Sequence, residues 1–224
     1  MKTVVVIPAY NEEKVIQGVL DEVKQLIAPE NIIVIDDGSY DNTAQIVKNN
    51  GITVYSHIIN RGLGGALGTG LKAGLLHDAD AVITLDADGQ HKPEELKNLL
   101  EPLEKDQADV VIGSRFLTSQ KMPKMRRLFN FVGNMITWVL FGIWTTDSQS
   151  GYRAFNRRAA RLIEIKTNKM EVSSEFFKEI KGNNLRLKEV PITAIYTEYS
   201  MSKGQSFTEG LKTVVRLILL RFRK

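Results

Sequence analysis

The chain has 224 residues, of which 43% are hydrophobic and 25% are charged, and it contains no cysteine. This composition excludes a disordered chain, disulfide bonds, thiolate metal sites and cysteine nucleophiles, and the length suits one globular domain. The net charge of +4 hides an asymmetry, because residues 1–114 carry −9 and residues 115–224 carry +13. We therefore expect cation binding in the first half. The second half should recognise an anion, such as a phosphorylated substrate, nucleic acid or anionic membrane.

The first half alternates short apolar runs with helical patterns. Runs rich in Val and Ile predict buried strands, and apolar stripes at helical spacing predict the helices between them. The expected strands span residues 4–7, 32–35, 52–56, 81–85 and 109–112, and the expected helices span about 12–26, 43–48, 63–76 and 93–103. Repeated strand–helix units with continuous apolar strands predict a mainly parallel sheet covered by helices.

Polar clusters follow four of the expected strands. They are Pro8–Glu12, Asp36–Ser39, Asp86–Asp88 and Gly113–Arg115. Ligands of parallel sheets bind beyond the carboxyl ends of the strands, which is where all four clusters fall. The sequence therefore predicts one shared site at that edge.

The strongest chemical signal lies in residues 83–91. Side chains alternate along an extended segment, so Asp86, Asp88 and Gln90 are expected to face the same way. Oxygen ligands of this kind suit Mg²⁺ or Mn²⁺, whose shell substrate phosphates often complete. The same residue types are common in ordinary turns, so the segment alone leaves both interpretations open. Its place among the other polar clusters favours the metal site.

A glycine-rich stretch, residues 62–70, invites a dinucleotide-binding interpretation. Gly68, Gly70 and Ala73 satisfy G-x-G-x-x-A, but the match falls inside a helical pattern and not between a first strand and its helix. We interpret the small residues as allowing a helix to lie close to the sheet.

The strand–helix alternation stops after Arg115. Residues 135–144 are strongly apolar and predict a helix that is either packed in the core or lies in a membrane interface, with Trp138 and Trp144 as interfacial anchors. A polar loop at 147–153, a helix at 175–181 and strand-like segments at 185–190 and 192–196 follow. Residues 210–224 predict a basic amphipathic helix, for which lipid binding, nucleic-acid binding and simple packing stay open. With no signal peptide and no long apolar run evident, we expect a cytoplasmic chain.

Taken together, these segments resemble a known family. Residues 6–13 (VIPAYNEE), 36–39 (DDGS) and 86–91 (DADGQH) look like family 2 glycosyltransferases of the GT-A fold, and most like the polyprenyl-phosphate sugar synthases, the group that includes dolichol-phosphate mannose synthase. Residues 113–115, 147–153 and 188–192 extend the likeness over nearly the whole chain. The resemblance implies a single α/β domain, 1–224, with a Rossmann-like, mainly parallel central sheet flanked by helices and with amphipathic interface helices.

In that family the first half, 1–114, binds a nucleotide-sugar, here GDP-mannose or a UDP-hexose. The resemblance implies that the donor is held by Pro8, Ala9, Tyr10, Glu12, Ile35, Asp37, Asp86, Ala87 and Arg115. It also implies that Asp88 and Gln90 ligate Mg²⁺ or Mn²⁺ and that Arg115 pairs with phosphate oxygens. The implied catalytic residues are Asp86, Asp88, Arg115 and Asp147.

The second half, 115–224, would receive a polyprenyl phosphate. Arg126, Arg127, Arg153 and Lys203 are the implied phosphate-binding residues, and the reaction would invert the anomeric centre. Asp147 is expected to orient the acceptor site, to act as a base, or simply to pair with Arg153. The resemblance predicts peripheral attachment to the cytoplasmic face of a membrane, directly or through a separate membrane protein.

Two other functions compete with this one. A family 2 enzyme with a soluble or glycan acceptor would carry the same donor motifs. A non-catalytic nucleotide-binding or nucleic-acid-binding module would explain the basic charge, but its basic residues should interleave with aromatic residues along a groove. They cluster instead beside the apolar segment and the implied phosphate site, so we expect no nucleic-acid partner.

Overall fold

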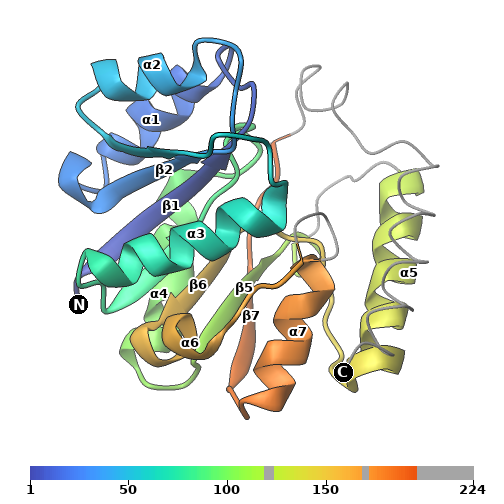
Figure 1. The fold of residues 1–224 in the computed structure, drawn as a ribbon. Helices are drawn as coiled ribbons and strands as arrows, with labels where there is room; N and C mark the ends of the chain where they lie inside the picture. Colours follow the sequence, from blue (N-terminus) through green and yellow to red (C-terminus); the bar gives the residue numbers. More distant parts are fainter. Residues whose placement is uncertain (119–123, 168–171, 196–224) are drawn as a thin grey trace.

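The computed structural model describes residues 1–118, 124–167 and 172–195. Their strands form a mixed sheet with the order β3-β2-β1-β4-β6-β5-β7, and helices cover both faces (Figure 1). The strands are β1 (Thr3–Ala9), β2 (Ile32–Asp36), β3 (Thr53–Ser56), β4 (Ala81–Thr84), β5 (Val110–Ser114), β6 (Arg153–Asn156) and β7 (Leu187–Pro191). The helices are α1 (Ile16–Lys24), α2 (Thr43–Asn49), α3 (Leu63–Leu76), α4 (Leu96–Glu104), α5 (Lys124–Phe141), α6 (Arg157–Leu162) and α7 (Val172–Gly182), with short 3₁₀ turns at Pro29–Asn31 and Pro93–Glu95.

The expected α/β class and mainly parallel sheet are confirmed. Strands β1, β2, β3 and β4 pair in parallel, as do β5 and β7. Strand β6 is the exception, because it lies antiparallel between β4 and β5. Neither β6 nor α6 was predicted. The predicted strand at 192–196 is absent from its described part, residues 192–195, where a single bridge joins His91 to Ala194.

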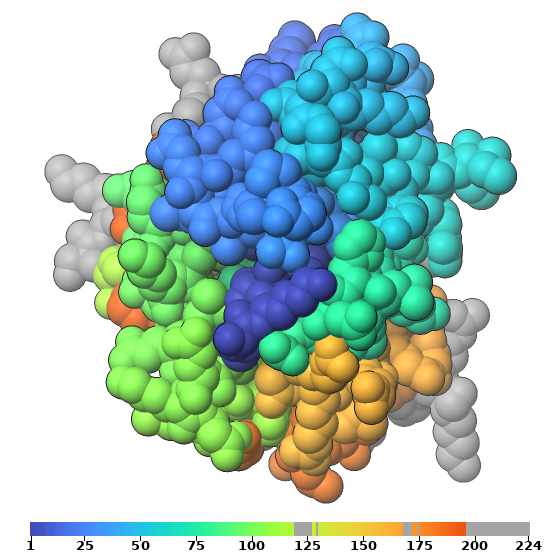
Figure 2. Space-filling model, turned by 90° about the vertical axis from the view of Figure 1, so that its left-hand side faces the viewer, coloured from blue at the N-terminus to red at the C-terminus, as the bar shows by residue number. Residues whose placement is uncertain are grey.

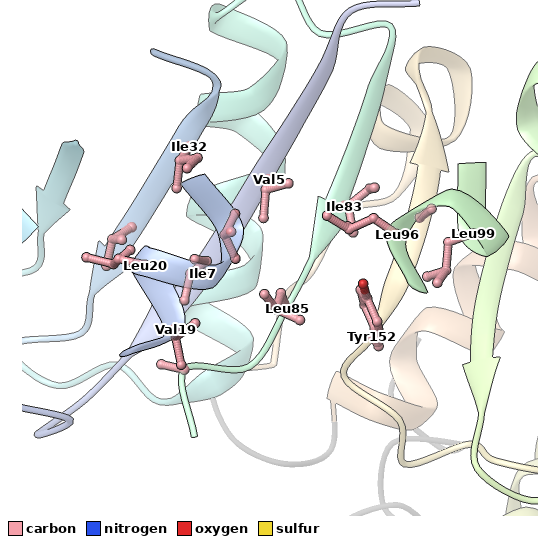
Figure 3. Packing of buried hydrophobic residues seen from close by; sticks show 14 of the residues in the cluster. Val5, Ile7, Val19, Leu20, Ile32, Ile83, Leu85, Leu96, Leu99 and Tyr152 are labelled. Carbon is pink, nitrogen blue, oxygen red and sulfur yellow. The ribbon is translucent and has the colours of Figure 1, made fainter. Parts of the chain in front are cut away.

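Alternating strand residues build a core on each face of the sheet. Val5 and Ile7 of β1 pack on one face with α1 and α4, while Val4 and Val6 face α3. Figure 3 shows the first of these layers, in which Ile83 lies between the α1 side and Leu96 of α4. Burial on both faces explains why the strands read as continuous apolar runs.

Glycines let α3 lie close to the sheet, as the sequence predicted. A Cβ at Gly70 would collide with the side chain of Val6, and one at Gly74 with that of Val82. Gly62 precedes the helix with a φ of +83°, a conformation that glycine adopts readily. The amino-terminal end of α3 is therefore brought to the carboxyl edge of β1 and β2.

The polar clusters lie at only one of the two ends of the sheet. Figure 2 looks at the side where β1 begins, and the start of the chain (dark blue) lies there between segments near residue 100 (green) and near residue 75 (teal), with segments near residue 160 (orange) below. The strands other than β6 run away from that side. The polar clusters at the strand ends consequently lie on the opposite side of the molecule.

Helix α5 lies at one side of the molecule beside α7 (Figure 1). Its polarity is inverted relative to an ordinary surface helix. The residues turned inward include Asn130, Asn134 and Thr137, whereas those turned outward include Leu128, Phe131, Val132, Met135, Trp138 and Val139. None of the helices in the described ranges is long and apolar enough to cross a membrane.

Candidate active site

The turns after β1, β2 and β4 line one cleft of about 290 Å³ at the carboxyl edge of the sheet. Its lining is Pro8, Ala9, Tyr10, Glu12, Asp37, Asn60, Gly62, Leu63, Ala66, Asp86, Ala87 and Asp88. All the predicted donor-binding residues except Ile35 and Arg115 are therefore brought together. Ile35 is fully buried in β2 and packs in the core on the α3 face.

The turn after β1 is held by the turn after β2. The N–H of Glu12 donates to Thr43 Oγ1 at 2.8 Å, and the N–H of Asn11 donates to Ser39 Oγ at 2.9 Å. Asn11 has a φ of +54°, which Asn tolerates better than most residues. Tyr10 meets Tyr40 edge to face at 6.1 Å. These contacts hold the turn after β1, which forms one wall of the cleft, in place without a ligand.

Asp37 forms the floor of the cleft beside α3. Only 3% of this residue is exposed, and its carboxylate accepts hydrogen bonds from Nδ1 of His57 at 2.7 Å and from the backbone N–H groups of Arg61 and Gly62 at 2.9 and 2.6 Å. Because Gly62 directly precedes α3, the carboxylate also meets the positive end of the helix. His57 was not among the site residues predicted from the sequence.

Asp86 lies between this cleft of about 290 Å³ and a second, smaller cavity. Its Oδ2 is 3.3 Å from Nε2 of His91, and its side chain is one-third exposed. Burial raises the pKa of Asp86, but the hydrogen bond and charge of His91 and the charges of Arg115 and Arg153 outweigh it, so the pKa lies below its usual value. A Cβ at Gly151 would fall on the Asp86 carboxylate. The main chain of Gly151 thus fixes where Asp86 can lie.

Asp88 and Gln90 form the outer corner of the site. The backbone N–H of Gln90 donates to Asp88 Oδ1 at 3.0 Å, and the Gln90 amide donates to Oδ2. Burial, and then the negative charge of Asp86, raise the pKa of Asp88. Across residues 1–118, 124–167 and 172–195 no three His, Cys, Asp or Glu side chains are grouped to hold a metal ion. A cation here would need the two carboxylates, Gln90 and oxygens from a substrate or water.

Asp147 is fully buried and pairs with Arg115. Its carboxylate accepts from Nε and Nη2 of Arg115 at 2.7 and 2.8 Å and from Nδ2 of Asn130 at 2.6 Å. The predicted alternative of pairing with Arg153 is therefore wrong. Glu189 on β7 holds the loop that carries Asp147, since it accepts from Thr145 Oγ1 and from the N–H of Asp147.

Arg153 is the first residue of β6 and lines the second cavity together with Asp86. This cavity, of about 70 Å³, is also lined by Leu63, Leu67, Thr84, Gln149, Gly151 and Ser173. The guanidinium stacks on Phe176 at 4.4 Å, and Nη2 donates to the carbonyl of Ser148. Burial lowers the pKa of Arg153 to about 10, although the charges of Asp86 and Asp147 oppose the shift. Among the described residues, its Nε has no hydrogen-bond partner.

The other predicted phosphate-binding residues are only partly described. Arg127 is exposed near the start of α5. The side chain of Arg126, together with Lys203 and the predicted helix 210–224, lies outside the described residues. The assignments of these residues to an acceptor stay predictions.

His57 and Glu189 are among the site residues that were not predicted from the sequence. His57 directly follows β3, so the same strand-end rule that found the other clusters points to it. Glu189 lies in the segment 188–192 that extends the family resemblance, but no role was assigned to it, because its contact with the loop that carries Asp147 spans 42 residues.

Comparison with known proteins places these features in a family. The family model described as glycosyl transferase family 2 matches residues 4–163. The chain is 38% identical to UDP-N-acetylglucosamine–dolichyl-phosphate N-acetylglucosaminyltransferase of Methanococcus voltae, over 98% of this chain and 96% of that protein. It is 32% identical to undecaprenyl-phosphate mannosyltransferase of Micrococcus luteus, over 96% and 93%. The fold is shared with glucosyl-3-phosphoglycerate synthase from Mycobacterium tuberculosis, solved with Mn²⁺, uridine diphosphate and phosphoglyceric acid. That similarity has a TM-score of 0.76 and 21% identity, over 98% of this chain and 78% of that one.

Proposed function

The chain belongs to glycosyl transferase family 2, and from this premise we propose that it transfers a sugar from a nucleotide-sugar to a polyprenyl phosphate. The observation that carries the proposal is the cleft that gathers Asp37, Asp86 and Asp88 at the sheet edge. Relatives named for transfer to dolichyl and undecaprenyl phosphates align along nearly the whole chain, which supports the lipid acceptor.

The donor nucleotide is proposed to lie in the 290 Å³ cleft. The turn after β1 and Asp37 would hold the base and ribose, and Asp86 would face the ribose and sugar. The negative lining is unsuited to an anion by itself, since Asp86 and Asp88 repel a diphosphate. A counterion is therefore part of the proposal.

Mg²⁺ or Mn²⁺ fits the donor set at this corner, because Asp88, Gln90 and the neighbouring Asp86 offer only hard oxygen ligands. Asp88 and Gln90 are the residues proposed to hold it. When bound, the cation would neutralise charge on the departing nucleoside diphosphate.

The reaction we propose is a single displacement. A phosphate oxygen of the acceptor forms a bond to the anomeric carbon, while the bond from that carbon to the donor diphosphate breaks and its electron pair leaves with the diphosphate. Attack opposite the leaving group inverts the anomeric centre. A phosphate oxygen is already ionised near neutral pH, so the buried Asp147 need not accept a proton. Its proposed role is to hold Arg115 in position.

Binding of the acceptor phosphate is assigned to the basic second half. The acceptor phosphate and the donor diphosphate are proposed to be held close together by four residues. These are Arg126 and Arg127 of α5, Arg153 and Lys203. Arg115, whose guanidinium is fixed by Asp147, would contact the donor diphosphate. Catalysis then rests on positioning and charge neutralisation.

The outward face of α5 is proposed to lie against the cytoplasmic face of a membrane. Trp138 and Trp144 meet edge to face at 6.2 Å and are 52% and 58% exposed. Exposed aromatic and aliphatic side chains along α5 and at Trp144, with Arg127 exposed near the start of the helix, suit a lipid interface. Attachment through a separate membrane protein is the alternative.

The test is product partitioning with the full chain. Labelled nucleotide-sugars are supplied with Mn²⁺ and vesicles that contain polyprenyl phosphate, and label is expected to enter the organic phase. If the label stays in a water-soluble product, the acceptor would be a small phosphorylated compound and not the lipid. That alternative is favoured by the shared fold with a synthase named for 3-phosphoglycerate. No transfer at all, or transfer unaffected by a chelator, would contradict the proposal.

A further inference from the structure

The carboxylate of Asp37 borders the donor cleft, but the protein itself uses most of its acceptor capacity. Oδ1 accepts from Nδ1 of His57 and from the N–H of Arg61, and Oδ2 accepts from the N–H of Gly62. An ionised carboxylate has about four lone-pair sites, two on each oxygen. Among the described residues no further donor reaches Asp37. Oδ1 is therefore saturated, and Oδ2 keeps one site for a ligand.

The hydrogen bond between His57 and Asp37 has a fixed direction. An ionised carboxylate only accepts, so Nδ1 of His57 carries the hydrogen. Nε2 of the same ring lies 2.9 Å from the hydroxyl of Thr69 on α3, and the ring is largely buried, with 12% of the side chain exposed. Both nitrogens of the imidazole are thus hydrogen-bonded. The ring occupies one of the two acceptor sites of Asp37 Oδ1, and the N–H of Arg61 occupies the other.

We propose that this arrangement selects a uridine donor over a guanosine donor, with His57 as the residue that positions Asp37 for the selection. The inference rests on the proposed nucleotide-sugar function. Uracil presents one imide N–H between two carbonyl groups, which matches a carboxylate with one open acceptor site. Guanine presents a ring N–H and an amino group side by side, and a carboxylate that reads both needs an open site on each oxygen.

The cost to guanine follows from this count. With Oδ1 closed by His57 and Arg61, a bound guanine would keep one N–H without a partner in a largely buried corner. We expect at least about tenfold weaker binding of GDP than of UDP, which corresponds to about 1.4 kcal/mol and lies within the range for an unpaired buried donor.

Calorimetric titration of the full chain with UDP and with GDP, both in the presence of Mn²⁺, tests the inference. His57→Leu removes the donor to Oδ1 and is expected to lower the ratio of the GDP to the UDP dissociation constant at least about fivefold. His57→Asn keeps an N–H near the position of Nδ1 and is expected to retain the ratio. In turnover, His57→Leu is expected to raise KM for the donor far more than it lowers kcat, as befits a positioning residue.

His77→Leu is the matched control. His77 lies at the other end of α3, where Nε2 contacts the hydroxyl of Tyr55 at 3.2 Å, away from the cleft. Its replacement is expected to leave the nucleotide ratio unchanged. If His57→Leu does not fold, Thr69→Val provides a milder variant, because it removes only the hydroxyl that holds the ring and should lower the ratio in part.

The outcomes separate this inference from the proposed function. GDP binding as tight as UDP binding in the wild-type chain would overturn the inference and leave the transferase proposal standing. A ratio that His57→Leu and Thr69→Val leave unchanged would overturn the role of His57. If folded wild-type protein bound neither nucleotide, the proposed function would fail together with the inference.

Discussion

Replacement of Asp147 by asparagine is expected to destabilise the protein strongly. The side chain is fully buried and accepts three hydrogen bonds from Arg115, two from the guanidinium and one from the backbone N–H at 3.1 Å. It accepts another from Asn130. Asparagine keeps the shape, but it removes the charge that balances Arg115 and places an NH₂ group where donors converge. The variant therefore removes the negative charge that neutralises the Arg115 guanidinium in a largely buried site.

The magnitude follows from the burial of the pair. Removal of one partner from a buried ion pair typically costs about 3–5 kcal/mol. The side chain of Arg115 is 16% exposed, so water partly compensates for the loss and the lower end, about 3 kcal/mol, applies. In a domain of this size each kcal/mol lowers Tm by about 2–4 °C, so we expect a fall of about 6–12 °C in a thermal unfolding scan.

Asp21→Asn makes the same chemical change in an exposed pair. Asp21 contacts Lys24 at 2.9 Å with 53% of its side chain exposed, and exposed pairs contribute little. If Asp147→Asn lowered Tm no more than Asp21→Asn, the reasoning from burial would be wrong. Activity gives a second test, because Arg115→Gln should add little to the loss of turnover in the Asp147→Asn background. A fully additive loss would indicate an independent role for Asp147.

Three further predictions concern the same site and the amino-terminal end of β5. Gly151→Ala should lower kcat at least about a hundredfold with little change in Tm, because the new methyl group displaces the Asp86 carboxylate; unchanged kcat would show that its position is not critical. Asp109 has its pKa lowered from 3.8 to about 2, chiefly by its hydrogen bond with Arg186. Its stabilisation should therefore be complete above about pH 4 and lost as the pH falls through 2. Urea unfolding of Arg186→Met should be less pH-dependent over this range, and an identical pH dependence would refute the assignment. Finally, Mn²⁺ should raise the Tm of the wild type by mass action, and Asp88→Asn should abolish this rise; a retained rise would place the cation elsewhere.

The gathering of the strand-end residues in one cleft could be predicted from the sequence because the information it needs is local. Pro8–Glu12, Asp36–Ser39 and Asp86–Asp88 each end a buried apolar run, and adjacent parallel strands bring such ends together without further detail. Their hydrogen-bond partners follow from the fold and not from the motifs. His57 closes one oxygen of Asp37 across a separation of 20 residues, which no short pattern records.

The second half was harder to predict because its key strand is short and reversed. Strand β6 has four residues, begins at Arg153 within a polar segment, and lies antiparallel between β4 and β5. Proximity in sequence suggested that Arg153 pairs with Asp147. The reversal instead directs Arg153 toward Phe176 and Asp86, while the end of β5 brings Arg115 to Asp147. Sequence separation alone does not decide which cation a buried carboxylate meets.

The opposite charges of the two halves meet at Asp86. This carboxylate comes from the acidic half, yet two of the cations that lower its pKa, Arg115 and Arg153, belong to the basic half. The strand that carries Arg153 pairs with β4, and the main chain of Gly151 limits the position of Asp86. The basic second half therefore helps to balance the negative charge of Asp86. Residues 115–224 therefore help to build the cleft that residues 1–114 line, because β6 pairs with the edge of β4, and because Arg115 and Arg153 add their charges to the effect of His91 in lowering the pKa of Asp86.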